Sequence, residues 1–335
     1  MGIHAFAALE AGQPLQAFEY EPEKLGDHDV DVDIEHCGIC HSDISMIKNE
    51  WGMSHYPLIP GHEAVGKVTA CGSQVSLVKP GDYVGVGWQS DSCGQCEWCA
   101  GGNENVCFTH NEGTIVDRFG GFAEAVRVNE RFAIPIPSDF DIKRVGPLLC
   151  GGVTSYSPLI THNIQSGMTV GIIGIGGLGH LGVKFARALG CEVTAFTSSD
   201  KKTEEAKSFG AHHVVSSTAP KALENLTNQY DFILNTANAD LDWQAYLKAL
   251  RPHGTLCFVG LPNSAISVDS DLLLDGEKKI AASAIGSPQR IRDMLEFAHQ
   301  HDVLPVTEHF QFSDINQAID HANTAPRFRV VLDMI

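Results

Sequence analysis

The sequence predicts an α/β protein that combines a β-rich segment with a doubly wound parallel sheet. Residues 1–148 contain short strand-like stretches separated by Gly and Pro, without alternation of strands and helices. Beyond residue 168, apolar strand-like runs alternate with helical patterns, and a glycine-rich turn follows the first run. The sequence therefore indicates two domains, a β-rich one at 1–150 and 287–335 and a parallel-sheet one at 151–286.

Composition and charge limit the function classes. The chain has 335 residues, of which 43% are hydrophobic and 19% charged, enough apolar material for sizeable cores. A formal net charge of -18 argues against nucleic acid or an anionic membrane as the main partner. The N-terminus lacks the features of a secretory signal, and no stretch reaches the ~18 apolar residues of a membrane helix. We therefore expect a cytoplasmic protein whose ten cysteines serve metal binding or catalysis before disulfides.

The strand-like stretches of the first domain are DVDVDIEHC at 29–37, GKVTACG at 66–72 and GDYVGVG at 81–87. Near the other end of the chain, a helical pattern from Ser287 leaves the parallel sheet. The tail from Phe310 then predicts one more helix and a last strand.

Four cysteines lie within fifteen positions: Cys93, Cys96, Cys99 and Cys107. Their spacings of two, two and seven residues allow four thiolates to surround one ion, and the glycines between them supply backbone freedom. A four-cysteine set leaves no position for water or substrate, so it predicts a structural zinc site. Disulfides and an iron–sulfur cluster are the alternatives.

A second set of metal ligands is spread over the motifs HCGICHSD, PGHE and LLCGG, which contribute Cys40, His62, Glu63 and Cys150. Two thiolates and an imidazole form a three-ligand set that leaves zinc an open position, as in catalytic sites. Asp43 is predicted either to accept a hydrogen bond from the far nitrogen of His62 or to cap a helix N-terminus. Cys37 is expected to be a small buried hydrophobe rather than half of a redox pair.

These motifs carry a resemblance to a known family. In order, GICHSD, PGHE, CGQCEWC and LLCGG resemble the zinc-dependent medium-chain alcohol dehydrogenases over essentially the whole chain. With MIKNEWG and IIGIGGLGH, the likeness narrows to the cinnamyl alcohol dehydrogenase-like branch and to bacterial NADPH-dependent broad-specificity aldehyde reductases. The resemblance implies a GroES-like catalytic domain completed by the C-terminal tail, a Rossmann dinucleotide-binding domain and a homodimer. It assigns the catalytic zinc to Cys40, His62 and Cys150.

The segment MTVGIIGIGGLGHLGVKFARALG at 168–190 predicts the start of the nucleotide domain. An apolar run at 170–173 precedes a GxGxxG turn, and a helical pattern then ends at Gly190. A GxGxxG between a strand and a helix lets a pyrophosphate approach the helix N-terminus. The predicted cofactor contacts of this turn are Gly174, Gly176, Gly177 and Gly179.

The end of the next strand-like run, CEVTAFT, predicts which nucleotide binds. A carboxylate there would bind the ribose 2′-hydroxyl of NAD, but the sequence continues with TSSDKK at 197–202. Hydroxyl groups followed by lysines suit a 2′-phosphate, and the resemblance assigns that role to Ser198, Ser199 and Lys202. Asp200 is the counter-argument, and lysines that merely begin a helix are the plain alternative. The predicted cofactor is NADP(H).

The resemblance also implies roles in the chemistry. Ser42 would begin the proton relay, with a helix cap as its alternative. Relatives often continue the relay with a histidine, but the corresponding positions here are Ser45 and Lys48. Glu63 would approach the zinc or be a buried ion-paired carboxylate.

Five further positions carry expectations with plain alternatives. Thr154 would contact the nicotinamide or be an ordinary helix residue. Trp51 and Trp88 would wall the substrate pocket or belong to the core. Arg327 or Arg329 would reach the pyrophosphate or lie on the surface.

The sequence therefore predicts an oxidoreductase with two zinc ions per subunit that transfers hydride between NADP(H) and primary alcohols or aldehydes, mainly as an aldehyde reductase. Zinc would polarise the substrate oxygen as a Lewis acid, and the cofactor would supply the hydride chemistry. Two alternatives stay open. One is an NAD-dependent secondary-alcohol or polyol dehydrogenase, and the other is a non-catalytic zinc- and nucleotide-binding protein.

Overall fold

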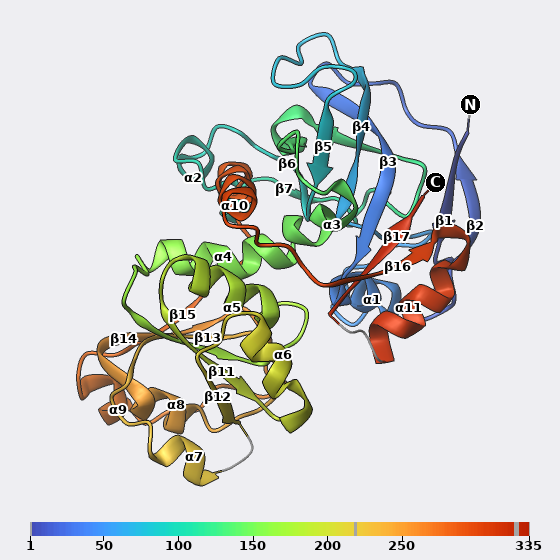
Figure 1. Cartoon of the computed structure of the whole chain (residues 1–335). Coiled ribbons are helices and arrows are strands. Elements are labelled where there is room, and N and C mark those ends of the chain that lie inside the picture. The colour runs from blue at the N-terminus through green and yellow to red at the C-terminus, as the bar shows by residue number, and fades with distance from the viewer. Residues whose placement is uncertain (1, 218–219, 325–327, 335) are drawn as a thin grey trace. The chain divides into compact units, whose positions relative to one another are not determined.

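The computed structural model describes residues 2–217, 220–324 and 328–334 and divides into two compact units (Figure 1). Unit 1 comprises Met1–Val153, Ile285–Gln300 and Leu304–Ile335, and unit 2 comprises Thr154–Ala284 and His301–Val303. The boundaries expected from the sequence, at 150 and 286, differ from the observed 153 and 284 by three and two residues.

Unit 1 is built around a seven-stranded sheet in which β16, β17, β3, β4, β5 and β9 follow one another and β8 pairs with β3. Its strands are β3 (Asp29–Ile39), β4 (Ala64–Cys71), β5 (Tyr83–Val86), β8 (Ala125–Asn129), β9 (Ile134–Pro135), β16 (Thr307–Gln311) and β17 (Arg329–Asp333). Strand β3 buries Val30, Val32 and Ile34 in alternation with aspartates, as the period of two requires. The core of unit 1 gathers these side chains with Met46 and Phe122.

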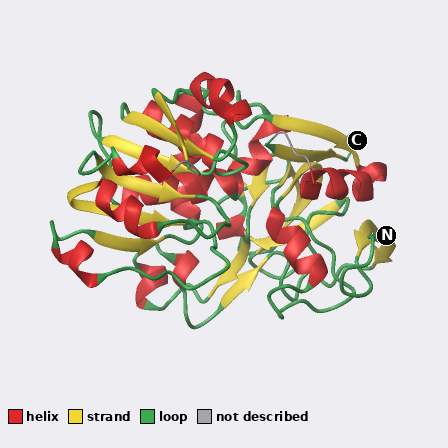
Figure 2. Cartoon of the chain, turned by 90° about the horizontal axis from the view of Figure 1, so that it is seen from below, coloured by secondary structure: helices red, strands yellow, loops and turns green. Residues whose placement is uncertain are grey.

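The C-terminal strand β17 pairs antiparallel with β3, so that Leu332 lies opposite Cys37. The tail of the chain therefore lies in the same sheet as the N-terminal third. Around this sheet lie two small two-stranded sheets and several helices: β1 (Ile3–Ala7), β2 (Gln16–Tyr20), β6 (Gln89–Ser92), β7 (Asn111–Gly113), α1 (His41–Lys48), α2 (Glu97–Ala100), α3 (Ile142–Val145), α10 (Pro288–Gln300) and α11 (Ile315–Thr324). In Figure 2, green loops lie beside the short strands at the end marked N.

Unit 2 holds a six-stranded parallel sheet in the order β12, β11, β10, β13, β14, β15. Its strands are β10 (Thr169–Ile173), β11 (Glu192–Thr197), β12 (His213–Ser216), β13 (Tyr230–Asn235), β14 (Leu250–Phe258) and β15 (Lys279–Ala282). Its helices are α5 (Gly179–Ala188), α6 (Thr203–Ser208), α7 (Pro220–Glu224), α8 (Trp243–Ala249) and α9 (Ser270–Leu274), and α4 (Gly151–Thr161) begins in unit 1 and continues into unit 2. Figure 1 shows α5 and α6 on one face of the sheet and α8 and α9 on the other. The predicted doubly wound sheet is confirmed.

The strand order of unit 2 reverses between β10 and β13, because the chain runs outward to β12 and returns on the other side of β10. In open parallel sheets, ligands bind at the carboxyl ends of the strands at such a reversal. The glycine-rich turn after β10 lies at this point.

Among the residues that the structure describes, no helix combines the length and the apolar character needed to cross a bilayer.

Candidate functional site

The candidate site of unit 1 forms where β3 ends and α1 begins. Cys40 is the N-cap residue of α1, and Asp43, in the first turn, accepts a hydrogen bond from the Cys40 backbone N–H at 2.9 Å. The other carboxylate oxygen of Asp43 accepts from the Gly61 N–H at 2.8 Å and lies 2.9 Å from Nδ1 of His62. Asp43 is completely buried. It therefore fills both roles left open by the sequence, because it caps the helix and holds the imidazole.

Four side chains converge beside this cap. Cys40, His62, Glu63 and Cys150 each offer a ligand atom, and these atoms lie within 4.8 Å of one another. The two sulfurs are 4.0 Å apart, close to the roughly 3.8 Å edge of a tetrahedron with Zn–S arms of about 2.3 Å. Among the described residues, Nε2 of His62 is buried and meets no hydrogen-bond partner. A buried imidazole nitrogen without a partner, next to two thiols, fits a metal ion.

The pKa values of the Cys40 and Cys150 thiols are shifted in opposite directions. A hydrogen bond from the Cys150 thiol, together with nearby His62 and Arg329, lowers the pKa of Cys40 well below its ordinary value. The same contact and burial raise the pKa of Cys150 well above its ordinary value. Burial opposes protonation of His62, but the charge and hydrogen bond of Asp43 raise its pKa well above the ordinary value. A divalent ion would take the place of the Cys150 proton and the proton on Nε2.

Glu63 has two environments, one for each carboxylate oxygen. Nη2 of Arg329, on β17, donates to Oε1 of Glu63, and both side chains are buried. Oε2 finds no partner among the described groups and packs against Gly38, where an added Cβ would lie 2.0 Å away. Burial raises the pKa of Glu63 to about 7 despite the guanidinium. The carboxylate is thus ion-paired and also belongs to the group of possible ligands.

This pairing changes the expectation for Arg329. The sequence predicts a contact of Arg327 or Arg329 with pyrophosphate or a surface position, whereas in the structure the Arg329 guanidinium is buried and bound to Glu63. Arg327, the other candidate, lies outside the described residues. The sequence allowed an ion-paired Glu63 but did not identify its partner, because the two residues are 266 positions apart in the chain.

Ser42 lies next to the ligand set, with its Oγ 3.8 Å from the Cys40 sulfur. The positions expected to continue a relay are engaged elsewhere. The Ser45 hydroxyl donates to Glu50 at 2.7 Å, and Lys48 lies 3.8 Å from the same carboxylate.

The rings of Trp88 and Trp51 pack in a row beside the proposed ligand His62. The Trp88 ring packs edge-on to the His62 ring at 5.1 Å between centroids. The Trp51 ring packs edge-on to Trp88 at 6.1 Å and is 42% exposed. An apolar wall therefore runs from the imidazole to the surface of unit 1.

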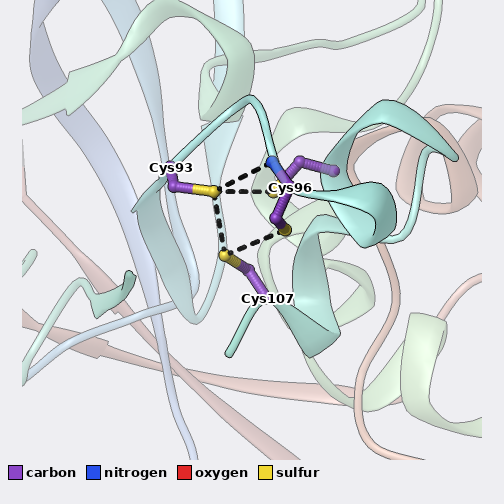
Figure 3. Close-up of side chains that lie close together, drawn as sticks. Cys93, Cys96 and Cys107 are labelled. Atoms are coloured by element: carbon purple, nitrogen blue, oxygen red, sulfur yellow. Dashed lines mark hydrogen bonds between the residues drawn. The ribbon is translucent and has the colours of Figure 1, made fainter. Parts of the chain in front are cut away.

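The four clustered cysteines also converge. Figure 3 shows the sulfurs of Cys93, Cys96 and Cys107 pointing toward one another, with Cys93 and Cys107 3.4 Å apart and Cys96 and Cys107 3.7 Å apart. Cys99 completes the set at 3.8 Å from Cys93. A backbone N–H of His110 leads the contacts that lower the pKa of Cys107 to about 6, whereas burial raises the pKa of Cys99 to about 12. Each of the ten cysteines is a free thiol, so disulfides are not the explanation.

The glycine-rich turn of unit 2 uses its glycines in different ways. Gly174 has a φ of +85°, which L side chains rarely adopt, and it turns the chain out of β10. A Cβ at Gly179 would lie 1.9 Å from the Gly174 carbonyl oxygen, so α5 can begin this close only with glycine. A Cβ at Gly176 would meet nothing within 4 Å, which leaves an open face where a pyrophosphate fits. Gly177 follows in the same turn.

The loop after β11 lies beside this turn. Nζ of Lys202 donates to the carbonyl of Ile175 at 2.7 Å, and the Lys202 backbone N–H donates to the Ser199 carbonyl at 3.0 Å. Ser198 is exposed and Ser199 half-buried. The three predicted 2′-phosphate contacts thus share one loop at the carboxyl end of the sheet. Thr154 is half-buried on α4.

Comparison with known proteins decides the family. Residues 26–138 match the family model of the alcohol dehydrogenase GroES-like domain, and residues 177–300 match that of the zinc-binding dehydrogenases. The chain is 47% identical to the aldehyde reductase AdhA of Synechocystis over 331 residues, which cover 98% of each protein. The chain belongs to the zinc-dependent medium-chain alcohol dehydrogenases.

Two solved structures show to which branch of the family this alcohol dehydrogenase belongs. It is similar to a cinnamyl alcohol dehydrogenase of Sorghum bicolor, with a TM-score of 0.94, 36% identity and coverage of 99% and 98% of the two chains. It is also similar to a Helicobacter pylori cinnamyl alcohol dehydrogenase complexed with NADP(H), with a TM-score of 0.91, 32% identity and coverage of 100% and 98%. The dehydrogenase therefore belongs to the cinnamyl alcohol dehydrogenase-like branch and combines a GroES-like with a Rossmann domain. It is an enzyme, which removes the non-catalytic alternative.

Proposed function

We propose that this dehydrogenase reduces aldehydes to primary alcohols with NADPH and zinc, and accepts both aliphatic and aromatic aldehydes. The observation that carries the proposal is the three-ligand set of Cys40, His62 and Cys150, in which Nε2 of His62 is buried without a described partner. A set of three protein ligands keeps one position of zinc open for substrate, in contrast to the saturated set of four cysteines.

The residues of unit 1 would prepare the reaction. When bound, zinc supplies a Lewis acid for the substrate oxygen and NADPH supplies the hydride. Asp43 fixes the imidazole of His62 by binding Nδ1, which directs Nε2 toward the thiols. Ser42, next to Cys40, would pass the proton that the product oxygen requires. With Ser45 bound to Glu50, we propose that this proton leaves Ser42 toward solvent.

The charge of the loop after β11 supports NADP(H) over NAD(H). Ser198 and Ser199 offer hydroxyls and Lys202 an ammonium group, and Lys202 already lies against the glycine-rich turn through Ile175. An acidic side chain at the end of β11 would repel a 2′-phosphate, and the strand ends in Thr197 instead. The NADP(H) named for the Helicobacter pylori relative agrees with this assignment. Thr154 would contact the nicotinamide.

The aromatic wall supports the substrate range. Trp88 contacts the proposed ligand His62, and Trp51 extends the wall to solvent. Flat apolar rings accept both aliphatic and aromatic chains by area burial, without a polar group that would select one of them.

Turnover tests the proposal directly. NADPH absorbance should fall when butanal or benzaldehyde is added, and absence of turnover with every aldehyde and alcohol of a panel would refute it. Faster turnover of ketones with NADH would favour a secondary-alcohol or polyol dehydrogenase instead. A Cys40→Ser variant should keep its fold by circular dichroism and lose turnover, and retained activity would contradict the catalytic ligand set.

We also propose a cytoplasmic homodimer that acts on small molecules and not on nucleic acid. Strand β15 ends the sheet of unit 2. Ile280 lies on β15, Leu274 precedes β15, and Leu261 follows the neighbouring β14; all three side chains are exposed. A second copy would cover this edge. The free thiols support a cytoplasmic location. The net charge of -18 supports small molecules rather than nucleic acid as partners. Light scattering after size exclusion tests the dimer, and a mass of one chain would exclude it.

A further inference from the structure

Arg131 lies against the loop that carries the four clustered cysteines. Its Nη1 donates to Oγ of Ser92 at 3.2 Å, and its Nη2 donates to the carbonyl of Ser92 and to Oδ1 of Asp91, each at 2.7 Å. A Cβ at Gly94 would lie 2.9 Å from Nη1, so the guanidinium touches the turn between the first two cysteines. Its Nε donates to Asn129 at 3.2 Å, which fixes the base of the side chain.

Ser92 connects this guanidinium to a ligand. Ser92 is 3% exposed, and its Oγ lies 3.6 Å from Sγ of Cys99, which is itself buried. As a metal ligand Cys99 is a thiolate, which has no proton and accepts hydrogen bonds. Because Arg131 already donates to Oγ, it occupies one of the lone pairs of Ser92. The hydroxyl hydrogen of Ser92 is then free to point at the Cys99 sulfur.

The charge of the proposed site makes such donors important. Four thiolates on one divalent zinc leave a net charge of about −2, and buried charge is costly unless it is hydrogen-bonded or paired. Backbone N–H groups of Gln95 and Cys96 reach Cys93, and those of His110 and Thr109 reach Cys107. Cys99 is buried, as Cys107 is; it receives the backbone N–H of Gly94 and faces the Ser92 hydroxyl.

We propose that Arg131 and Ser92 are positioning residues for the structural zinc site, in which Arg131 orients the Ser92 hydroxyl as a donor to the Cys99 thiolate. This inference rests on the proposed function of the four cysteines as a zinc site. It concerns how firmly that ion is held and leaves the catalytic ligand set untouched.

A purely structural role is the competing explanation. Arg131 also forms an ion pair with Asp91 and could serve only to brace β6. The two explanations differ for Asp91→Asn, which removes the ion pair but leaves both contacts of Arg131 with Ser92. A brace predicts that Asp91→Asn loses zinc as fast as Arg131→Gln. Positioning of Ser92 predicts that Asp91→Asn holds zinc at least as well as the parent chain.

The experiment measures zinc release from full-length chains in a Cys40→Ser background, which keeps only the structural ion. Zinc per subunit is measured by mass spectrometry, and its release rate is followed with 4-(2-pyridylazo)resorcinol. We expect Arg131→Gln and Ser92→Ala each to release zinc about 10- to 100-fold faster, the usual effect of removing an outer partner of a ligand. Because both act through one hydrogen bond, the double variant should release zinc about as fast as the faster single variant.

Two controls complete the test. Arg118→Gln removes another arginine of unit 1, which pairs with Glu112 and donates to the Arg127 carbonyl, and it should release zinc at the parent rate. Arg131→Lys keeps the positive charge but loses the forked guanidinium, so its zinc release rate should lie between those of the parent and Arg131→Gln. If Arg131→Gln does not fold, Arg131→Lys still tests the proposal. Parent-like release from Arg131→Gln, fast release from Asp91→Asn, or multiplicative effects in the double variant would each overturn the proposal. A Cys40→Ser chain without zinc would refute the structural site itself.

Discussion

Single residues in this dehydrogenase serve the fold and the site at once. Asp43 accepts hydrogen bonds from the N-cap N–H of α1 and from Gly61 while it holds Nδ1 of His62. The start of the helix and the direction of the imidazole are therefore fixed by one buried carboxylate. The residue pattern allowed both roles to be foreseen, but not that one side chain performs them together.

The Glu63–Arg329 pair permits a stability prediction at the same scale. Arg329→Met leaves a buried carboxylate without its partner, which costs about 3–5 kcal/mol of unfolding free energy. Urea unfolding followed by circular dichroism should show this loss. The double variant Glu63→Gln and Arg329→Met should recover a large part of it, because no buried charge remains. A double variant as unstable as the sum of the single variants would contradict the pairing.

At the scale of elements, the glycine-rich turn separates stability from cofactor binding. Gly179→Ala places a Cβ 1.9 Å from the Gly174 oxygen, so we expect a loss of about 1–3 kcal/mol in stability. Gly176→Ala meets nothing within 4 Å and should keep the parent melting temperature. It should weaken NADPH binding at least about tenfold, since the methyl group occupies the pyrophosphate face.

The measurements for this pair are thermal unfolding and NADPH fluorescence titration. The two variants act as controls for each other, because each is expected to change mainly one readout. Parent-like NADPH affinity in Gly176→Ala would mean that the pyrophosphate does not approach this face.

The carboxyl group of Glu130, which binds the loop before β5, permits a pH prediction. Burial alone would raise the pKa of Glu130, but the N–H groups of Ser76 and Leu77, at 2.7 and 3.0 Å, and the His28 ring lower it below the ordinary value. A carboxyl group with a lowered pKa in the folded state stabilises the fold above its unfolded pKa of about 4.3, and this contribution is lost as pH falls through the folded value.

We therefore expect Glu130→Gln to cost about 1–3 kcal/mol at neutral pH. The difference from the parent should stay constant above about pH 5 and shrink below about pH 4.3, where the parent carboxyl is also neutral. Urea unfolding across this range measures it, with exposed Glu10→Gln as the matched control. A difference that grows on acidification would have the wrong sign for this mechanism.

Local signals predicted the elements that depend on local sequence. The helix after the glycine-rich turn was expected to stop at Gly190, and α5 ends at Ala188 with Gly190 at a φ of +83°. Strand pairing is different, because it joins distant segments. Neither segment alone shows that β17 pairs with β3. The contact of Arg329 with Glu63, which results from this pairing, could therefore not be predicted from local sequence. Strand β16, polar and half-exposed, lacks the apolar alternation that announces a strand.

At the scale of the whole molecule, the two functions lie in different units. All ligands of both proposed zinc sites belong to unit 1, whereas the glycine-rich turn and Lys202 belong to unit 2. Each unit has its own hydrophobic core, unit 1 around Val32 and Phe122 and unit 2 around Phe196 and Tyr246. The four-cysteine motif and the glycine-rich turn are each continuous in the sequence and could be assigned to a region from local signals. The catalytic ligands are spread over residues 40–150, and the family resemblance joined them.

Separate cores imply that nucleotide binding survives loss of metal. Removal of zinc from the full chain with a chelator should abolish aldehyde turnover. The Kd for NADPH should change by less than about threefold, which corresponds to less than about 0.7 kcal/mol of binding free energy. Metal content, turnover and NADPH fluorescence are measured on the same sample, and added zinc should restore turnover. The Cys40→Ser variant is the matched control, because it lacks one ligand but meets no chelator. If NADPH affinity falls in step with zinc content, the two units do not act independently, and the assignment of cofactor binding to unit 2 alone is wrong.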